Sequence, residues 1–476
     1  MSASRKRIIV VGGGIGGLAA AALLGRAGHE VTLLEANDHL GGKSRRIVLA
    51  GQRMDTGPSL VTFPGVWEEL LRRWDEMGDG VPAREVAGLE LRRLPEVGRY
   101  YYRGEVSSLP VEKGHPWHAA WERFVGVHGG LGPEVTRLLV TDPLDRNTLP
   151  ALRRLLKVYG FRLTTRGYLD RLKWLPDGLR EVIAIHTLNA GVAPPRTPAL
   201  YASMPAIMAE EGVWVPEGGV YEVILSLARL ARAGGADLRT GEPVTEISRD
   251  RVTTALREYP ADAVVSGLDA DVLEGLLETG KKARAKRLSC SGVAIYAALR
   301  AKLPENTATH GVVLPARPAA LYRSLEATEE PEETMAFVNY YRPGQVYPNE
   351  KGTLALLFTA PPNGRSYGLG DAFVAREMER VGQEIGLPRP LQEYLGEHIV
   401  LHPHYFSGWG AEGGALYGAV RPVWQSGPFH RPRYSERRRP WLWRVGASVH
   451  PGGGIPAVLG GAMISTGRLL KVLERR

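Results

Sequence analysis

Hydrophobic and polar positions at the start of the chain follow first a strand pattern and then a helix pattern. Residues 8–11 form an unbroken apolar, β-branched run, which is typical of a strand buried on both faces. Glycines follow at once, and the alanine- and leucine-rich residues 18–24 then favour a helix that ends at Gly28. Residues 31–35 are again apolar and β-branched. The pattern predicts a strand–loop–helix–strand unit with parallel strands.

Similar patterns recur farther along the chain. Pro64 opens a predicted helix with four large apolar residues on one face, and residues 220–230 repeat this spacing before a pair of glycines. Two strand candidates, 237–247 and 261–267, are assigned to the same unit as the first strands. Residues 293–299, 335–341 and 353–358 predict antiparallel strands of a second sheet, whereas 442–445 predicts a strand before a C-terminal helix that begins at Pro456.

The order of these patterns predicts an α/β fold with insertions. From about Tyr100 to Tyr201 the sequence is irregular and rich in aromatic residues, arginine and proline, which indicates a cap of short helices. We expect a Rossmann-type nucleotide-binding domain with an inserted antiparallel-sheet substrate domain and a helical cap. The expected segments are 1–100, 218–288 and 439–476 for the nucleotide-binding domain, 101–217 for the cap, and 289–438 for the second sheet.

Composition narrows the class of protein. The chain has 476 residues, of which 44% are hydrophobic and 23% charged, so it has ample apolar residues for cores and is not disordered, collagenous or coiled coil. A single cysteine, Cys290, excludes an internal disulfide and a multi-thiolate metal site, and it fits a reducing compartment. No metal-ligand spacing is present, so no metal is predicted.

The net charge and the N-terminal apolar run both bear on whether the protein contacts or crosses a membrane. Residues 8–25 follow Arg5-Lys6-Arg7 and imitate a signal peptide, but five glycines between positions 12 and 17 weaken a continuous apolar helix. The net charge is +9, with basic clusters at 281–287 and 437–439. These clusters are either a solvated surface or a surface that attracts anionic lipid headgroups. Neither belongs to a nucleic-acid-binding pattern, so nucleic acid is not a predicted partner.

The first glycine loop carries a dinucleotide-binding pattern. Gly12, Gly14 and Gly17 fit G-x-G-x-x-G, in which the glycines permit a tight turn, a close approach to pyrophosphate and close helix–strand packing. Glu35 ends the second strand, 21 residues after Gly14, where a carboxylate can accept hydrogen bonds from a ribose diol. This unit leaves NAD and FAD open, because both contain ADP.

Two further glycine-rich segments favour FAD. Gly41-Gly42-Lys43 lets the chain return against a dinucleotide with a cation near its phosphates, and Gly57 and Ser59 place small residues where a flat ring must pass. Residues 445–457 form an apolar strand, a glycine loop and a helix start with Pro456. Such a helix N-terminus would stabilise the anion that forms when a flavin is reduced.

At these motifs the chain resembles the carotenoid desaturase family, within the amine oxidase-like flavoprotein superfamily. Residues 7–60 and 440–470 carry the resemblance, through VVGGGIGGLAAAALLGRAGHEVTLLEA, GGKSRR, MDTGPSLVT and LWRVGASVHPGGGIPAVLGGAMIST, and GVWVPEGGVYEVILSLA adds to it. The resemblance implies that the ADP half of FAD is held by Gly12, Gly14, Ile15, Gly16, Gly17, Glu35, Gly41, Gly42 and Lys43. It also implies that the backbone of Val244 meets the adenine, and that Gly446, Gly454, Ile455 and Pro456 lie by the flavin.

The resemblance implies an FAD-dependent oxidoreductase that removes hydrogens from a long acyclic C40 polyene, with hydride passing to flavin N5. Lysine instead of arginine at position 43 is more similar to the branch that introduces a 3,4-double bond into 1-hydroxy or 1-methoxy carotenoids (methoxyneurosporene dehydrogenase). Phytoene desaturation, carotene isomerisation, another amine oxidase-like activity and a non-enzymatic prenyl or lipid carrier remain alternatives. The family implies a cytoplasmic protein, peripherally associated with the inner face of the cell membrane.

The sequence indicates little about which residues take part in the reaction itself. Aromatic residues of the predicted cap either line a substrate tunnel or form the cap core: Trp117, Trp121, Phe124, Tyr159, Phe161, Trp174 and Tyr201. No catalytic acid or base is identified, and His450 beside the last glycine loop receives no role. The sequence does not distinguish quinone from oxygen as the final electron acceptor.

Overall fold

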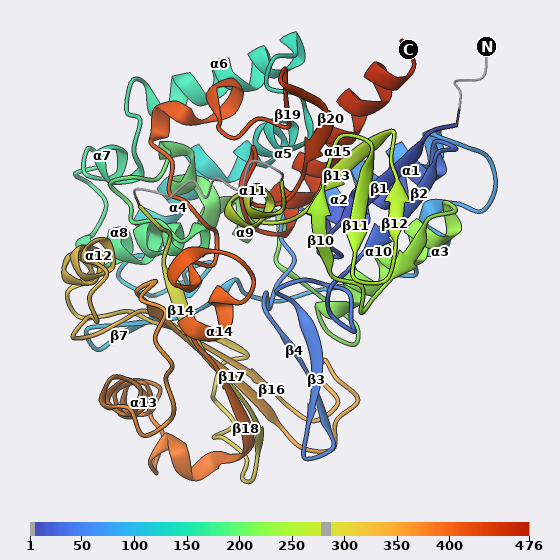
Figure 1. The fold of residues 1–476 in the computed structure, drawn as a ribbon. Coiled ribbons are helices and arrows are strands. Elements are labelled where there is room, and N and C mark those ends of the chain that lie inside the picture. The colour runs from blue at the N-terminus through green and yellow to red at the C-terminus, as the bar shows by residue number, and fades with distance from the viewer. Residues whose placement is uncertain (1–4, 278–286, 476) are drawn as a thin grey trace.

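The computed structural model describes residues 5–277 and 287–475, and its central feature is a six-stranded sheet (Figure 1). The strand order is β19-β20-β13-β1-β2-β9, and all neighbours are parallel except β19. The strands are β1 (Arg7–Val11), β2 (Glu30–Leu34), β9 (Asp237–Arg239), β13 (Ala263–Ser266), β19 (Ser435–Glu436) and β20 (Arg439–Arg444). This sheet joins segments from both ends and the middle of the chain, as the sequence predicts.

Helices cover this sheet and bury its apolar strands. Helix α1 (Ile15–Arg26) is buried from Gly16 to Gly25, and α10 (Tyr221–Ala233) and α15 (Ile455–Leu473) pack against it. Helices α2 (Pro64–Glu76), α3 (Ala83–Ala87) and α11 (Ala270–Leu276) complete this region. The N-terminal apolar run 8–25 thus forms β1 and α1 of a packed domain.

One described helix, α15, is long and apolar enough to cross a membrane. It contacts α1, α2 and α5 (Gly132–Val140). More than half of its most apolar stretch is buried inside the protein, as in a core helix.

The expected strand over 237–247 is wrong as one element. It divides into β9, in the six-stranded sheet, and β10 (Val244–Ile247), in a separate three-stranded sheet with β11 (Arg251–Thr254) and β12 (Glu258–Pro260). Gly241, with a φ of +69°, and Pro243 interrupt the strand. The Gly241 N–H donates to the carbonyl oxygen of Asn37 at 2.7 Å, so the chain turns toward the end of β2.

The second sheet has seven strands in the order β18-β14-β17-β16-β15-β6-β7. Its predicted antiparallel strands are confirmed as β14 (Ser291–Leu299), β16 (Ala336–Tyr341) and β17 (Thr353–Ala360). Strands β15 (His310–Val313) and β18 (Leu395–Leu401) extend it, and α12 (Pro318–Ala327), α13 (Ala372–Glu384) and α14 (Pro403–Ser407) accompany it. The apolar face of α13 shares one core with β14, β16 and β17.

The expectation of helical structure from about residue 100 is wrong for its first part. β6 (Gly98–Tyr102) and β7 (Glu105–Leu109) form a hairpin, and β6 pairs in parallel with β15 of the second sheet. The sequence Arg-Tyr-Tyr-Tyr lacks a clean alternation, so only the pairing with a distant strand defines this element. The short sheets β3 (Arg45–Leu49)–β4 (Gln52–Thr56) and β5 (Leu91–Arg93)–β8 (Trp214–Pro216) connect the regions.

The cap is a cluster of short helices, as predicted. It contains α4 (His118–His128), α5, α6 (Leu149–Tyr159), α7 (Thr165–Leu169), α8 (Asp177–Ile185) and α9 (Met204–Glu211), with 3-10 turns η1 (Gly129–Leu131), η2 (Arg146–Thr148), η3 (His186–Ala190) and η4 (Ala199–Ser203). Further 3-10 turns are η5 (Leu391–Tyr394), η6 (Glu412–Gly414), η7 (Val423–Gln425) and η8 (Gly427–Phe429). Asp142 in the cap accepts two hydrogen bonds from Arg468 of α15, at 2.5 and 2.6 Å.

Candidate active site

The first glycine loop is built from backbone contacts that exclude side chains. Gly12, with a φ of +99°, donates its N–H to the carbonyl oxygen of Leu34 at 2.8 Å. A Cβ on Gly17 would lie 2.0 Å from the carbonyl oxygen of Gly12, so only glycine allows β1 and α1 to approach this closely. Gly14 is the N-cap of α1, and no side chain caps that helix. Its first N–H groups therefore face the site.

Glu35 lies directly after β2 and is buried. Its Oε2 accepts the Gly13 N–H at 2.7 Å, and its Oε1 accepts the Asn37 backbone N–H at 2.9 Å and the Asn37 side-chain amide at 2.6 Å. These bonds fix the carboxylate beside the glycine loop. Oε2 keeps acceptor capacity for a further hydroxyl, because each carboxylate oxygen carries two lone pairs.

The second glycine loop lies against the first. The Gly41 N–H donates to the carbonyl oxygen of Gly13 at 2.8 Å. A Cβ on Gly42 would lie 3.4 Å from the Cα of Gly14, so side chains at these two positions would fill the space between the loops. Gly41 and Gly42 have φ angles of +120° and +59°, which glycine adopts without strain.

Lys43 points from this loop toward the second half of the chain. Its Nζ donates to the carbonyl oxygen of Leu416 at 2.6 Å. Burial lowers the pKa of Lys43, and the nearby carboxylate of Asp269 partly opposes that effect. The result is a desolvated ammonium group, which attracts an anion more strongly than an exposed one does.

The two ends of the chain meet at the start of α1. A Cβ on Gly16 would lie 2.9 Å from the backbone nitrogen of Gly446 and 3.3 Å from a methyl group of Val458 in the first turns of α15. Gly454 precedes α15 with a φ of +93°, and the first turn of this helix has neither a capping side chain nor an acidic residue. Two helix N-termini with uncapped N–H groups are therefore neighbours, which favours an anionic ligand.

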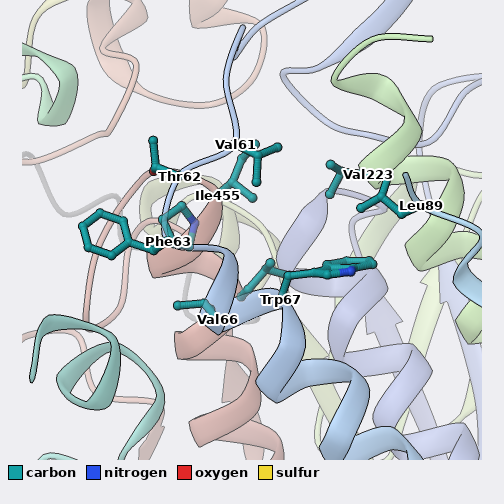
Figure 2. Close-up of a pocket in the computed structure, with 10 residues that line it drawn as sticks. Val61, Thr62, Phe63, Val66, Trp67, Leu89, Val223 and Ile455 are labelled. Atoms are coloured by element: carbon teal, nitrogen blue, oxygen red, sulfur yellow. The ribbon is translucent and has the colours of Figure 1, made fainter. Parts of the chain in front are cut away.

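Ile455 and Pro456 at the start of α15 line a small apolar crevice of about 10 Å³. Figure 2 shows Val61, Phe63 and Trp67 around Ile455, where α2 and α15 begin. The crevice has space for about one water molecule. Ile455 is buried against this crevice, whereas the N-cap residue Gly454 is exposed.

Three tyrosines of the second sheet region hold the segment that contains Gly57 and Ser59. The Gly57 N–H donates to the Tyr296 hydroxyl at 3.0 Å, and the Tyr341 hydroxyl donates to the carbonyl oxygen of Ser59 at 3.4 Å. The Asp55 N–H donates to the Tyr347 hydroxyl at 3.1 Å. Burial raises the pKa of Tyr296 to about 12, so its hydroxyl stays neutral and the segment stays attached to the sheet.

Val244 lies at the start of β10, beyond the turn that follows β9. The Glu242 N–H donates to the backbone carbonyl of Glu35 at 2.9 Å, so this segment passes directly beside the end of β2. The side chain of Val244 is half-buried. Its backbone N–H and carbonyl belong to β10, an edge strand of the three-stranded sheet.

Comparison with known families decides the class of protein. A family model described as flavin containing amine oxidoreductase matches residues 15–346, which is more than half of the chain. The chain belongs to this family. It is an FAD-dependent oxidoreductase, and the predicted cofactor class and Rossmann-type fold are confirmed.

Relatives of this flavin-containing family member align over nearly its whole length. The chain is 29% identical to a zeta-carotene-forming phytoene desaturase of Myxococcus xanthus, over 99% of the chain and 95% of the relative. It is 29% identical to a hydroxyneurosporene desaturase of Cereibacter sphaeroides, over 94% of each. It is 27% identical to a 4,4'-diapolycopene oxygenase of Methylomonas, over 96% of each.

Solved structures of similar fold include amine oxidases. A putrescine oxidase triple mutant aligns with a TM-score of 0.63 at 13% identity, over 99% of both chains. Cyclohexylamine oxidase of Brevibacterium oxydans aligns with a TM-score of 0.61 at 15% identity, over 99% of this chain and 100% of the other. At such identities the likeness shows the fold alone.

The geometry of the flavoprotein fits its cofactor class. The pairs Gly12–Gly17 and Gly14–Gly42 form a side-chain-free cradle, and Glu35 keeps an acceptor for a ribose hydroxyl. Lys43 and the uncapped starts of α1 and α15 supply positive charge. Within residues 5–277 and 287–475, no group of three or more His, Cys, Asp or Glu side chains is arranged to hold a metal ion.

A larger cavity of about 230 Å³ lies between the cap and the second sheet. Polar and apolar groups share its wall, and the ion pair of Arg196 with Glu326, 2.7 Å from Nε to Oε1, lies at its lining. The other polar lining residues are Arg287, Thr328 and Glu412. The apolar lining consists of Leu188, Val192, Ala193, Leu288, Cys290, Leu325 and Val420. Burial raises the pKa of Cys290 to about 12, which keeps its thiol protonated and unreactive.

Tyr417 connects this cavity to the site, and sequence reasoning missed it. A Cβ on Gly191, a lining residue of the cavity, would lie 2.6 Å from the Tyr417 ring, and one on Gly453 would lie 2.2 Å from it. The ring thus packs between the cavity wall and the glycine loop before α15. No local signal could identify Tyr417, because its neighbours are distant in sequence.

Of the two interpretations left open for the aromatic cap residues, the structure supports cap core for five of the seven, including Trp117 and Trp174, which pack against the main hydrophobic core. Trp121, Phe124 and Tyr159 are buried in the main hydrophobic core, whereas the Phe161 side chain is 93% exposed. Of the two basic clusters, residues 281–286 lie outside the described residues. In the other, Arg439 forms an ion pair with Glu274 at 3.2 Å.

Proposed function

We propose that the protein is a carotenoid desaturase that introduces a 3,4-double bond into an acyclic 1-hydroxy or 1-methoxy carotenoid. Similarity over nearly the whole chain to three enzymes whose names refer to carotenoids carries the carotenoid part of the proposal. The proposed 3,4-specificity is supported by the similarity to the hydroxyneurosporene desaturase and by the ion pair at the larger cavity. Each alignment covers 94% or more of this chain, so most of the cap and of the second sheet is included. The amine oxidase likeness, at 13% to 15% identity, supports only the shared fold.

The proposed roles at the cofactor site follow from the contacts described above. Gly12, Gly14, Ile15, Gly16, Gly17, Gly41 and Gly42 would provide the backbone cradle of the ADP half, with Glu35 accepting from the ribose and Val244 beside the adenine. Lys43 would neutralise phosphate charge. Gly57, Ser59, Gly446, Gly454, Ile455 and Pro456 would border the ring. FAD, when bound, supplies the hydride acceptor that no side chain can provide.

The chain would contribute charge stabilisation and a rigid border to the ring site. The uncapped N-terminus of α15 carries a partial positive charge, which favours negative charge that develops in front of it. An apolar crevice lined by Phe63, Trp67 and Ile455 lies beside that end of the helix. Tyr296 and Tyr341 hold Gly57 and Ser59 in place through their hydroxyls, so the border of the ring site would be rigid.

The 230 Å³ cavity supports an apolar substrate with a polar end. The apolar part of its wall suits the end of a polyene chain, and the bidentate Arg196–Glu326 pair, at 2.7 and 3.1 Å, offers a donor and an acceptor to a terminal hydroxyl. A hydrocarbon end such as that of phytoene could form no hydrogen bond with this pair. The similarity to the hydroxyneurosporene desaturase is consistent with this preference.

The proposal includes a location and leaves the electron acceptor open. A carotenoid is dissolved in the bilayer, so its enzyme works at a membrane surface. We propose that this chain is cytoplasmic and peripherally associated with the inner face of the cell membrane. Assays under air and with added quinone distinguish oxygen from quinone as the acceptor.

The test is expression in cells that accumulate defined acyclic carotenoids, followed by pigment chromatography and absorption spectra. We expect a 1-hydroxy carotenoid to gain one conjugated double bond and its absorption to shift to the red. The matched variant Arg196→Leu/Glu326→Leu should reduce conversion of the hydroxy substrate without loss of bound flavin.

Each other outcome overturns a defined part of the proposal. Conversion of phytoene in preference to the hydroxy carotenoid would overturn the 3,4-specificity and retain desaturation. A product with altered geometry but no added double bond would indicate an isomerase. Flavin-loaded protein that converts no carotenoid would overturn the proposal as a whole.

A further inference from the structure

Residues 144–163 of the cap, here called the α6 face, expose an unusual number of large apolar side chains. Helix α6 buries Ala151, Leu155 and Tyr159 against the cap. The exposed set is Leu144, Leu149, Leu152, Leu156, Phe161 and Leu163, with exposed fractions from 46% to 93%. Figure 1 shows α6 along the outer edge of the molecule, away from both large sheets.

The exposed leucines of α6 form one stripe. Leu149, Leu152 and Leu156 are spaced three and four residues apart, so they share one side of the helix. This side is adjacent to the buried one and continues into Phe161, whose side chain is 93% exposed. Contiguous exposed apolar surface of this kind indicates an interaction site.

Basic side chains border the stripe. The α6 face contains five arginines or lysines and a single carboxylate, Asp145. Arg154 pairs with Glu134 at 2.7 Å. In the described part of the chain the other four cations have no ion-pair partner: Arg146, Arg153, Lys157 and Arg162. Unpaired cations beside exposed leucines match an anionic lipid surface, in which leucines insert below the headgroups that the cations bind.

A second copy of the chain fits this face less well. A symmetric dimer would bring the α6 face of one protomer against the same face of its partner. The unpaired Arg153 and Lys157 of the two copies would then repel each other. Charge complementarity therefore favours a negatively charged bilayer as the occupant.

The α6 face is connected to the wall of the 230 Å³ cavity. The Ala199 N–H donates to the carbonyl oxygen of Leu163 at 2.9 Å, and the Arg166 N–H donates to that of Pro194 at 3.1 Å. Residues 191–193 and Arg196 line the cavity. The loop with the most exposed apolar residues thus adjoins the segment that borders the cavity.

We propose that the α6 face docks the protein on an anionic bilayer, with Leu152, Leu156 and Phe161 inserted among the lipids. The use of this contact for taking up a lipophilic substrate rests on the proposed function. The contact itself does not, because it depends only on surface chemistry.

The test is sedimentation of the flavin-loaded, full-length protein with vesicles of phosphatidylcholine alone or mixed with phosphatidylglycerol. We expect binding to the anionic vesicles that weakens as salt is added. Leu152→Glu/Leu156→Glu should lower the partition constant at least about tenfold. Arg153→Gln/Lys157→Gln should lower it about fivefold for each charge removed, on anionic vesicles only.

The control is Leu256→Glu, which changes a comparably exposed leucine in the turn between β11 and β12, outside the cap. It should bind vesicles like the unchanged protein. Phe161→Glu tests the same face without touching a packed helix and should also weaken binding.

Several results would overturn the proposal. They are unchanged binding by both glutamate variants of the α6 face, equal binding to neutral and anionic vesicles, or a dimer in solution that Leu152→Glu/Leu156→Glu dissociates. Failure of the proposed function looks different, because vesicle binding would persist while no carotenoid is converted. If only docking fails, the protein would still convert detergent-dispersed carotenoid.

Discussion

The glycine loops and the cap both contain polar groups inside the protein, but they arrange these groups in opposite ways. Around the glycine loops, backbone atoms approach one another so closely that no side chain fits, as between Gly12 and Gly17 or Gly16 and Gly446. In the cap, side chains supply the contacts. His128 bonds the Ser203 hydroxyl at 2.7 Å and the Tyr168 hydroxyl at 3.1 Å, and all three residues are buried.

The glycine loops are suited to ligand binding, whereas the cap network contributes to stability. Backbone N–H groups that point into an open loop can bind a ligand, whereas the polar groups around His128 already satisfy each other. Burial lowers the pKa of His128 to about 3, so its ring is neutral and structural. We therefore expect changes in the glycine loops to affect flavin binding and changes in the cap network to affect stability alone.

The largest effect is expected from Gly17→Ala. Its Cβ would lie 2.0 Å from the Gly12 carbonyl oxygen, so β1 and α1 must separate. We expect a loss of about 3 kcal/mol in the free energy of unfolding and a purified protein without flavin. Gly467→Ala, in an open position of α15, is the control and should stabilise slightly. Denaturant titration and the flavin absorption spectrum measure both, and retained flavin in Gly17→Ala would contradict the comparison.

Acid should destabilise the protein through its buried histidines. Burial lowers the pKa of His128 to about 3 and those of His186 and His310 to about 4, against an ordinary value of 6.5. The unfolded chain therefore binds more protons than the folded protein below pH 6.5. Stability is complete above that pH and is lost as pH falls through 6.5 toward 4.

Denaturant unfolding at pH 7 and pH 5 measures this loss. His128→Phe should reduce the difference between the two pH values, because one titrating ring is removed. An unchanged pH dependence in this variant would show that the cap histidine is not among the groups responsible.

Glu35→Gln tests the side chain that the glycine loop depends on. The amide would replace one carboxylate oxygen that accepts from Gly13 or Asn37, and it would weaken the acceptor for a ribose hydroxyl. We expect FAD affinity to fall about tenfold, equivalent to about 1.4 kcal/mol. Glu30→Gln, at the exposed start of the same strand, should bind FAD normally in a fluorescence titration. Equal affinities for both variants would remove Glu35 from the proposed site.

Tyr168→Phe should have the smallest and most specific effect on the free energy of unfolding. It removes only the hydroxyl that bonds His128 at 3.1 Å. We expect about 1 kcal/mol of lost stability with full flavin content. Flavin loss in this variant would mean that the cap network supports the cofactor site after all.

Much of the dinucleotide-binding region could be predicted because its constraints are local. Gly12, Gly14 and Gly17 lie within six positions, and Glu35 follows at the end of the next strand. Pro456 likewise indicates the start of α15. Glycine lacks a side chain and tolerates a positive φ, and proline favours the first turn of a helix. Because these are properties of single residues, they can be predicted from the amino-acid sequence alone.

The rest of the site could not be predicted, because its contacts join distant residues. Tyr296 bonds Gly57 across 239 positions, and Lys43 reaches Leu416 across 373. A tyrosine in a strand carries no mark of its distant partner. The hairpin β6–β7 was missed for a similar reason, since its pairing with β15 defines it.

The amino-acid sequence by itself determined the nucleotide-binding unit, the cofactor class and the order of the regions, because glycine spacing and apolar periodicity act over a few residues. Only the tertiary structure decided that Tyr417 lies between the cavity and the last glycine loop, that the aromatic residues Trp121 and Phe124 are cap core, and that the leucines of α6 face solvent. These outcomes depend on which surfaces pack together, and burial is a property of the whole fold rather than of any segment.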